Sequence, residues 1–245
     1  MKNRIDIILT ERGLVKSRTC AAQLIKEGSV SVNGVTLRKP SEQVDEAADI
    51  SVSDTSALTR YVGRGGLKLE TAIEQFGISP AGCVCLDIGA STGGFTDCML
   101  RNGALRVYAV DVGSAQLDMK LRNDGRVISL ENLDIRNADS SHIPEKAAFI
   151  TADVSFISQK AILPEIKRFA APGALCCTLI KPQFELGKAK LGKSGVVRDP
   201  KLREKAVKDI TGFAAALGFA DIRTVPSKIT GGDGNLEYLM CCVIP

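Results

Sequence analysis

Strand-like and helix-like segments alternate through most of this chain, and a glycine-rich turn follows the first strand of the series. The turn, Asp87-Ile-Gly-Ala-Ser-Thr-Gly-Gly94, joins an apolar run over 83–88 to a helical pattern over 94–102. Further strands are predicted over 106–111, 127–130, 149–152, 174–180, 221–225 and 237–244, with helices over 67–76, 157–169 and 200–217. Such alternation predicts a doubly wound, Rossmann-like α/β sheet of seven mostly parallel strands.

The first 53 residues follow a different pattern. Helices are predicted over 4–12 and from Ser17 or Thr19 to Glu27, where Gly28 can stop the second one. Asn33-Gly34 stands inside an alternating run over 29–37, which indicates a β-hairpin, and a short strand is predicted over 50–52. We therefore expect two domains, a small α+β domain over 1–60 and a large α/β domain over 61–245.

The small domain is basic. Residues 1–40 hold eight lysines and arginines against three acids, which favours contact with phosphate groups. The stretch RIDIILTERGLVKSRTCAAQLIKEGSVSVNGVTLRKPSEQV resembles the S4 RNA-binding domain, although a hairpin adaptor with merely solvated charges is the alternative. A second basic segment follows residue 181. The predicted RNA-contacting residues are Arg4, Arg12, Lys16, Arg18, Lys26, Arg38, Lys188, Lys190, Lys193 and Arg198.

Composition narrows the remaining classes of protein. With 245 residues and 44% hydrophobic residues the chain can bury a sizeable core, and its net charge of +4 permits a nucleic-acid partner without requiring one. The start MKNRIDIILTERG lacks the apolar stretch of a signal peptide, so we expect a cytoplasmic protein without a membrane partner. Eight cysteines without a C-x-x-C pair and a single histidine favour buried reduced thiols and no metal site.

The glycine-rich turn predicts a cofactor. It is not G-x-G-x-x-G, because Ser91 replaces the glycine that lets the backbone approach a pyrophosphate. A nucleoside without a pyrophosphate fits better, and S-adenosylmethionine suits an acidic loop because it is cationic. Asp111, 22 residues past Gly89, is expected to hold the ribose hydroxyls, and Asp134 the adenine amino group. The predicted cofactor-binding residues are Asp87, Gly89, Ala90, Ser91, Thr92, Gly93, Gly94, Asp111, Val112 and Asp134.

Four charged residues are the candidates for catalysis, namely Lys68, Asp153, Lys181 and Glu237. Asp153 and Lys181 end predicted strands, Glu237 begins the last one, and Lys68 starts the helix before the first. A ribose 2′-hydroxyl is a weak acid, and a free lysine is protonated at neutral pH and cannot remove its proton. A second ammonium group and partial desolvation favour a neutral amine, and carboxylates can orient it. We predict that Lys181 is the base, steered by Asp153 and Glu237 and assisted by Lys68.

The complete pattern resembles one family. The segments YVGRGGLKLE, DIGASTGGFTD, AVDVG, LIKPQFE and GGDGNLEYL, together with the N-terminal module, are similar to the hemolysin A/TlyA family, whose catalytic domain is FtsJ/RrmJ-like. The resemblance implies S-adenosylmethionine-dependent 2′-O-methylation of ribosomal RNA, with cytidine as the nucleotide and ribosomal RNA or subunits as the partner. The chain departs from the pattern where Ser114-Ala115 follow Asp-Val-Gly in place of an aromatic, which puts cofactor affinity in doubt.

Three other functions are alternatives to RNA methylation. The family's hemolysin name implies membrane lysis, but the sequence shows neither an amphipathic nor a long apolar segment for it. A non-catalytic RNA-binding factor for ribosome assembly would keep the fold without binding the cofactor. A nicotinamide dehydrogenase disagrees with the missing second glycine. Phe184 is a candidate either for stacking on a flipped base or for plain packing.

Overall fold

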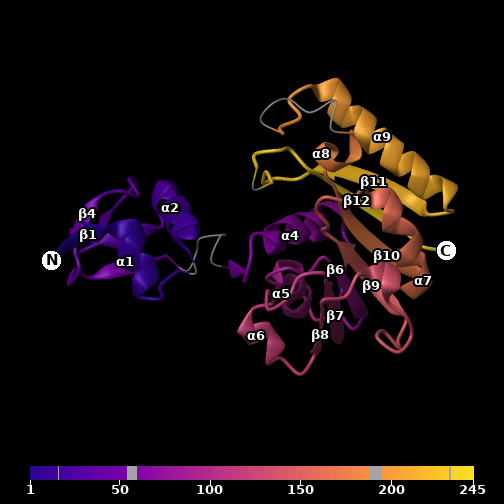
Figure 1. Cartoon of the computed structure of the whole chain (residues 1–245), viewed down its shortest axis with the longest axis horizontal. Helices are drawn as coiled ribbons and strands as arrows, with labels where there is room; N and C mark the ends of the chain where they lie inside the picture. The colour runs from indigo at the N-terminus through magenta and orange to yellow at the C-terminus, as the bar shows by residue number, and fades with distance from the viewer. Residues whose placement is uncertain (16, 54–59, 188–194, 232) are drawn as a thin grey trace. The chain divides into compact units, whose positions relative to one another are not determined.

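A computed structural model describes residues 1–15, 17–53, 60–187, 195–231 and 233–245 of the chain. The chain divides into two units, Met1–Tyr61 and Val62–Pro245, which are drawn in indigo to purple and in purple to yellow in Figure 1. Each unit has its own apolar core.

The first unit joins two helices to two small antiparallel sheets. Its elements are β1 (Lys2–Arg4), α1 (Ile5–Glu11), α2 (Arg18–Glu27), β2 (Val30–Val32), β3 (Val35–Thr36), β4 (Gln43–Asp45) and β5 (Ile50–Val52). The predicted hairpin is confirmed, because Asn33 and Gly34 turn β2 into β3 with φ of 48° and 79°. Ser17 caps α2 by accepting from the backbone N–H of Cys20.

One prediction for this unit was wrong. The helix expected to start at Arg4 starts at Ile5, because residues 2–4 form β1 and pair with β4. This pairing has no local sequence signal, since β1 and β4 are three residues long and about forty residues apart.

The second unit contains the predicted seven-stranded sheet. Its strands are β6 (Val84–Ile88), β7 (Arg106–Asp111), β8 (Val127–Glu131), β9 (Ala147–Ala152), β10 (Ala170–Ile180), β11 (Ala220–Pro226) and β12 (Tyr238–Val243). The strand order is β11-β12-β10-β9-β6-β7-β8. The five strands from β10 to β8 run parallel, and β12 is antiparallel to both of its neighbours. The predicted fold class is confirmed.

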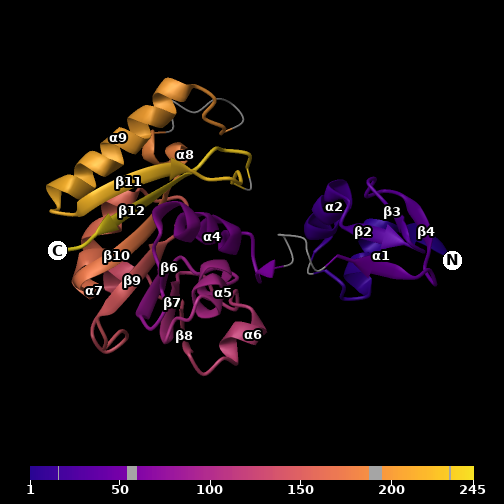
Figure 2. The same ribbon diagram turned by 180° about the vertical axis from the view of Figure 1, so that it is seen from behind.

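Helices cover both faces of this sheet, with α4 and α5 on one face and α7 and α9 on the other (Figures 1 and 2). The helices are α4 (Gly65–Phe76), α5 (Gly94–Arg101), α6 (Met119–Arg122), α7 (Leu163–Phe169), α8 (Pro182–Glu185) and α9 (Pro200–Ala216). Short 3₁₀ turns span η1 (Ile135–Asn137) and η2 (Gln159–Ala161). The helix predicted over 157–169 is therefore two elements. Pro164 lies in the first turn of α7, where its missing N–H breaks the helical ladder running back to η2.

The core of the second unit lies along the central parallel strands. Leu86, Tyr108, Phe149 and Ile150 are almost completely buried, because these strands are covered on both faces. Each such side chain contributes about 1.5–3 kcal/mol by leaving water.

The order of the strands decides where a ligand can bind. From β6 the chain moves outward to β7 and β8, and then returns to place β9 on the other side of β6. In sheets of this type the connections from two neighbouring central strands leave in opposite directions. A crevice then opens at the carboxyl ends of those two strands. The loops after β6, β7 and β9 surround that crevice here.

Candidate functional site

The glycine-rich turn lies against the exit of β9. Gly89 has φ of +80°, and its N–H donates to the Val110 carbonyl at 2.8 Å. A Cβ at this position would lie 2.7 Å from the Asp153 carbonyl oxygen. Only glycine fits this backbone conformation and this space, so Gly89 sets how closely the loops after β6 and β9 approach each other.

A second close approach brings Lys68 toward the same loops. A Cβ at Gly94, the first residue of α5, would lie 2.8 Å from the Gly66 nitrogen and 2.9 Å from the Gly63 carbonyl oxygen. The start of α4 therefore packs directly on the start of α5. Lys68 stands in the first turns of α4, so this contact carries its side chain to the rim of the sheet.

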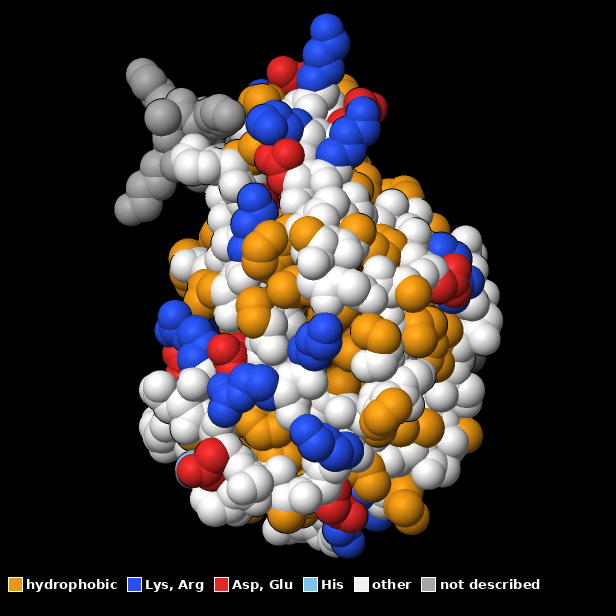
Figure 3. Space-filling view, turned by 90° about the vertical axis from the view of Figure 1, so that its right-hand side faces the viewer, with side chains coloured by type: hydrophobic (Ala, Val, Ile, Leu, Met, Phe, Trp, Pro, Cys, Tyr) orange, Lys and Arg blue, Asp and Glu red, His pale blue; other side chains and the backbone are white. Residues whose placement is uncertain are grey.

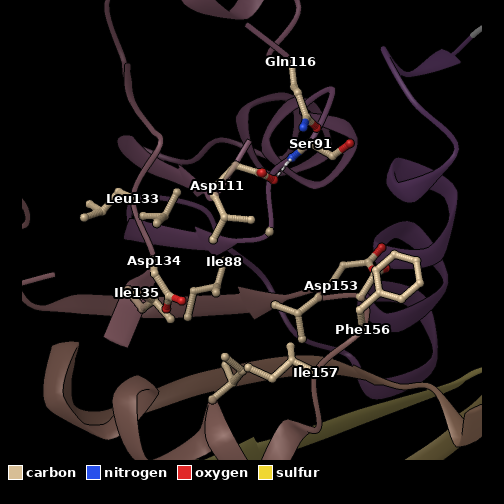
Figure 4. Close-up of a pocket in the computed structure, with 16 residues that line it drawn as sticks. Ile88, Ser91, Asp111, Gln116, Leu133, Asp134, Ile135, Asp153, Phe156 and Ile157 are labelled. Carbon is tan, nitrogen blue, oxygen red and sulfur yellow. Dashed lines mark hydrogen bonds between the residues drawn. The ribbon is translucent and has the colours of Figure 1, made fainter. Parts of the chain in front are cut away.

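A cavity of about 350 Å³ opens at this rim, and Figure 4 shows the residues around it. Leu133, Asp134 and Ile135 lie at one end, and Asp153 and Phe156 lie at the other. The volume falls in the range of small-molecule and cofactor sites. Apolar walls with a few carboxylates are typical of a pocket that takes a nucleoside.

The two aspartates predicted for nucleoside contact both line this cavity. Asp111 holds the loops together, because Oδ2 accepts from the Ser91 N–H and Oδ1 from the Gly113 N–H, each at 2.7 Å. Asp134 accepts from the backbone and the guanidinium of Arg136, which lowers the pKa of Asp134. The predicted Val112 also lines the cavity, and its side chain is exposed.

Asp87 is placed differently from the other predicted cofactor residues. It has no exposed surface, and its carboxylate accepts from Thr96 Oγ1 at 2.6 Å and from Thr151 Oγ1 at 2.8 Å. Burial raises its pKa to about 6, although the two threonines oppose this shift. Asp87 therefore supports the loop from inside the sheet and is not among the residues that line the cavities beside the loop.

A second cavity of about 190 Å³ continues from the first toward Lys181. Ala90, Thr92 and Gly94 of the glycine-rich turn line it, and Gly89, Ser91, Asp153 and Ser155 line both cavities. Gly93 packs away from this space, since a Cβ there would lie 2.2 Å from Leu121 Cδ1. The turn thus forms one wall of a continuous path from Asp134 to Lys181.

The structure brings the four charged candidates together at the end of this path. Lys68 Nζ lies 2.6 Å from Glu237 Oε2 and 3.7 Å from Asp153 Oδ2, and Lys181 Nζ lies 2.6 Å from Asp153 Oδ1. The four side chains alternate in charge and come from α4, the β9 exit, the β10 exit and the residue before β12.

We call Lys68, Asp153, Lys181 and Glu237 the tetrad. Its side chains have little contact with solvent. The exposed fractions are 8% for Lys68, 7% for Lys181 and 2% for Glu237. Lys181 donates its hydrogen bond to Ser155 Oγ at 2.9 Å, and its contact with Asp153 Oδ1 is an ion pair without aligned hydrogen-bond geometry. Asp153 Oδ1 is buried and accepts no hydrogen bond from the described residues. The Lys181 ammonium group therefore compensates the charge of this oxygen through the ion pair.

Several residues of the site were missed by the sequence analysis. Ser155 and Phe156 lie in the loop after β9, and Phe156 is 91% exposed with φ of 64°. Its ring lies 5.1 Å from that of Phe184, which is the aromatic that the sequence did single out. The signal for Phe156 was its place three residues after Asp153, but an exposed phenylalanine cannot be distinguished from a buried one by sequence position.

The sequence analysis also missed Glu131, the last residue of β8, which contacts the loop after β7. Glu131 accepts from the backbone N–H groups of Ala115, Gln116 and Leu117 and pairs with Arg122, and these contacts lower the pKa of Glu131 to about 2, the Leu117 bond most of all. The loop that contains Ala115 and Gln116 is therefore shaped by a carboxylate from β8.

The basic residues predicted to contact RNA differ in how they are held. Arg4 and Arg18 both pair with the buried Asp6, and this pairing lowers the pKa of Asp6. Arg12 donates to the Ala48 and Glu46 carbonyl oxygens, and Arg38 donates to that of Lys26. These side chains are anchored but largely solvent-facing, as are Lys26 and Arg198. The remaining predicted residues, Lys16, Lys188, Lys190 and Lys193, lie outside the described residues.

Figure 3 shows a different surface, the side of the molecule that lies at the right of Figure 1. Lysine and arginine side chains are scattered over this face, several of them beside acidic side chains, among apolar and uncharged groups.

Comparison with known families decides the class of this protein. The model of FtsJ-like methyltransferases matches residues 61–243, and the S4 domain model matches residues 3–50. The chain belongs to the FtsJ-like methyltransferase family. The second unit is thus an FtsJ-like methyltransferase domain, and the predicted resemblance, including the S4 domain, is confirmed. A nicotinamide dehydrogenase is excluded.

Curated relatives of this FtsJ-like protein span nearly the whole chain. "Putative rRNA methyltransferase YqxC" of Bacillus subtilis is 45% identical over 98% of this chain and 85% of its own length. "16S/23S rRNA (cytidine-2'-O)-methyltransferase TlyA" of Mycobacterium tuberculosis is 41% identical over 97% and 88%. "Hemolysin A" of Brachyspira hyodysenteriae is 40% identical over 98% and 100%. Names of both kinds, methyltransferase and hemolysin, occur among these relatives.

Solved structures agree with the FtsJ-like fold. A "Putative hemolysin" of Streptococcus thermophilus is 41% identical with a TM-score of 0.78, over 99% of this chain and 88% of that one. The N-methyltransferase NodS of Bradyrhizobium japonicum shares the fold alone, with 14% identity and a TM-score of 0.51 over 74% of this chain and 98% of that one. Across the part of the chain that the structure describes, no helix is both long and apolar enough to cross a membrane.

Proposed function

We propose that this protein transfers a methyl group from S-adenosylmethionine to a ribose 2′-hydroxyl of ribosomal RNA, with cytidine as the target nucleotide. The observation that carries the proposal is the tetrad of Lys68, Asp153, Lys181 and Glu237 at the point where the path from the nucleoside cavity ends. The names of the relatives that act on rRNA cytidine support the choice of substrate.

The two cavities fit the parts of this cofactor. Ile88, Leu133 and Ile135 offer apolar surface for an adenine ring, and Asp111 offers carboxylate oxygens for ribose hydroxyls. The second cavity, between the glycine-rich turn and Lys181, suits an amino-acid chain that carries a cationic sulfur. When bound, S-adenosylmethionine supplies an electrophilic methyl group.

The tetrad supplies the base. We assign the role of base to Lys181, and Asp153, which is shared between Lys181 and Lys68, orients its amine toward the substrate. Lys181 then removes the 2′-hydroxyl proton while the ribose oxygen forms its bond to the methyl carbon and the carbon–sulfur bond breaks. The proton remains on Lys181, where Asp153 stabilises the new charge.

Lys68 and Glu237 act mainly by orientation. Their 2.6 Å ion pair is buried, so it holds one fixed geometry beside Asp153. Ser155 fixes the direction of the Lys181 amine through its 2.9 Å hydrogen bond. Correct placement of reacting groups accounts for a large part of enzymatic rate enhancement.

Recognition of RNA is assigned to two features. The basic S4 domain supplies phosphate contacts through Arg12, Arg18, Lys26 and Arg38. The exposed ring of Phe156 at the mouth of the cavity offers a face on which an unstacked base can lie.

The experiment compares the wild-type protein with Lys181→Ala in methyl transfer from tritiated S-adenosylmethionine to ribosomal subunits, followed by mapping of ribose methylation. We expect the variant to lose at least about a hundredfold in rate, which is the lower range for removal of a general base. Its affinity for S-adenosylmethionine, measured by calorimetry, should stay within a few-fold. Lys205→Ala, which removes an exposed ion pair on α9, is the matched control and should keep full activity.

Equal rates for Lys181→Ala and the wild type would remove Lys181 as the base. RNA binding by a wild-type protein that binds no S-adenosylmethionine would support a non-catalytic assembly factor instead. Leakage of liposomes that is independent of Lys181 would support the hemolysin name.

A further inference from the structure

Two loops carry most of the reaction end of the site. The segment 153–159, which follows β9, holds Asp153, Ser155 and Phe156, and the segment 181–185, which follows β10, holds Lys181 and Phe184. Catalysis needs a fixed relation between these loops, because the proposed base stands on one and its partners stand on the other.

Glu185 joins the two loops from the α8 side. Its Oε2 accepts from Ser158 Oγ, and its Oε1 accepts from the Gln159 N–H at 2.9 Å. The carboxylate is half-buried, and burial raises the pKa of Glu185, opposed by its two hydrogen bonds. Gln159 adds a further tie, since its Nε2 donates to the Leu179 carbonyl of β10 at 2.8 Å.

The residue between these hydrogen-bonded positions, Phe156, has a strained backbone conformation. Phe156 has φ of 64° in the left-handed region, which a residue with a side chain adopts at a cost. Such a conformation persists only where the surrounding contacts hold it. The Ser155–Lys181 bond holds the chain just before Phe156, and Glu185 holds the chain just after it. The ring itself is 91% exposed, so packing of the ring alone cannot fix the backbone.

We infer that Glu185 is a positioning residue, which clamps the loop after β9 so that Phe156 projects beside Phe184 and Lys181 keeps its register with Ser155 and Asp153. The effect of this clamp on methyl transfer rests on the proposed function. The structural role of Glu185 in holding the loop does not depend on that function. The partner of the clamped aromatic pair is an unstacked base of single-stranded RNA, whose flat face matches an exposed ring.

The chain contains no tryptophan, so Phe156→Trp creates a single fluorescent probe at the clamped position. Time-resolved anisotropy of this probe reports nanosecond motion of the loop. In the Phe156→Trp background we expect Glu185→Ala to increase the amplitude of the fast component. Glu185→Gln should restore the slow behaviour, because an amide can still accept from the Gln159 N–H and bond to the Ser158 hydroxyl.

The second measurement is the steady-state kinetics of methyl transfer to RNA, in protein that keeps Phe156. Glu185→Ala should raise the KM for RNA about tenfold, which corresponds to about 1.4 kcal/mol, with the affinity for S-adenosylmethionine unchanged. Glu145→Ala is the control, since Glu145 pairs with Arg106 and Tyr108 just before β9, at the end of the strand away from the site. It should change neither the anisotropy nor the KM.

An anisotropy decay identical in Glu185→Ala and its Phe156→Trp parent would overturn the assignment. If Glu185→Ala lacks a cooperative melting transition, Ser158→Ala removes the same contact from the other loop and is judged by the same two results. A wild-type protein without methyl transfer to any ribosomal RNA would refute the proposed function, and the anisotropy comparison would still decide the role of Glu185.

Discussion

The candidate site has a nucleoside end, which is the cavity lined by Asp111 and Asp134, and a reaction end, which is the charged tetrad. Different kinds of contact hold these two ends. At the nucleoside end, Asp111 binds backbone N–H groups at Ser91 and Gly113, so the geometry is fixed mainly by the main chain. At the reaction end, Lys68 and Glu237 are 169 positions apart and meet only through their side chains. The comparison teaches that the cofactor end depends on close backbone approaches at glycines and on Asp111, whereas the reaction end depends on charged side chains that meet only in the tertiary structure.

The largest expected effect comes from breaking the buried ion pair. Lys68→Met leaves Glu237 buried without its cation, and removal of one partner of such a pair costs about 3–5 kcal/mol of unfolding free energy. We expect a lowered melting temperature for the methyltransferase domain and no methyl transfer, as measured by calorimetry and the tritium assay.

Two further variants sharpen this result. The double variant Lys68→Met with Glu237→Leu should recover most of the stability without activity, since no unpaired charge remains. Lys228→Met breaks an exposed pair with Glu74 and should cost less than about 1 kcal/mol. A similarly small loss for Lys68→Met would show that the tetrad is not a tightly coupled buried network.

The second effect tests the nucleoside end. Asp111→Asn weakens two charge-assisted bonds to the loops and removes the carboxylate proposed for ribose contact. We expect the affinity for S-adenosylmethionine, measured by calorimetry, to fall about tenfold to a hundredfold, or about 1.4–2.8 kcal/mol. The rate at saturating cofactor should stay close to that of the wild type. A lower rate with unchanged affinity would contradict the division of the site into two ends.

The third effect is a pH dependence of the folded state's stability that originates at Asp87. Its pKa is about 6 in the folded protein against 3.8 as the ordinary value, so the folded state binds the proton more tightly than the unfolded chain. This contribution to stability is complete below about pH 4 and is lost as the pH rises through about 6. In Asp87→Asn, the decline in melting temperature over this window should therefore be smaller than in the wild type.

Asp124→Asn is the matched comparison. The guanidinium of Arg126 lowers the pKa of Asp124, so this carboxylate stabilises the fold above its ordinary pKa and loses that contribution as the pH falls. The two variants should thus change the pH dependence of the melting temperature with opposite sign. Identical profiles for Asp87→Asn and the wild type between pH 4 and 7 would remove Asp87 as the titrating group.

The sequence could predict features that depend on neighbouring residues. The strands and their order of appearance follow from apolar runs and turn residues, and Asn33-Gly34 specifies its hairpin because both positions adopt positive φ. The glycine-rich turn could be located because strand, turn and helix are contiguous. Failures occurred where the signal was short or remote, as with β1 and β4, or where Pro164 divides a helical pattern.

The residues of the candidate site also divide into those that local sequence identifies and those that only tertiary packing reveals. The sequence by itself determined that two lysines and two acids stand at or near the ends of strands and helices, because each lies in a recognisable local pattern. Tertiary structure alone decided that Asp87 faces Thr96 and Thr151 inside the sheet, that Phe156 projects into solvent, and that Glu185 reaches the loop after β9. Local patterns fix where a side chain begins, whereas its partners are set by the packing of segments that are distant in the chain.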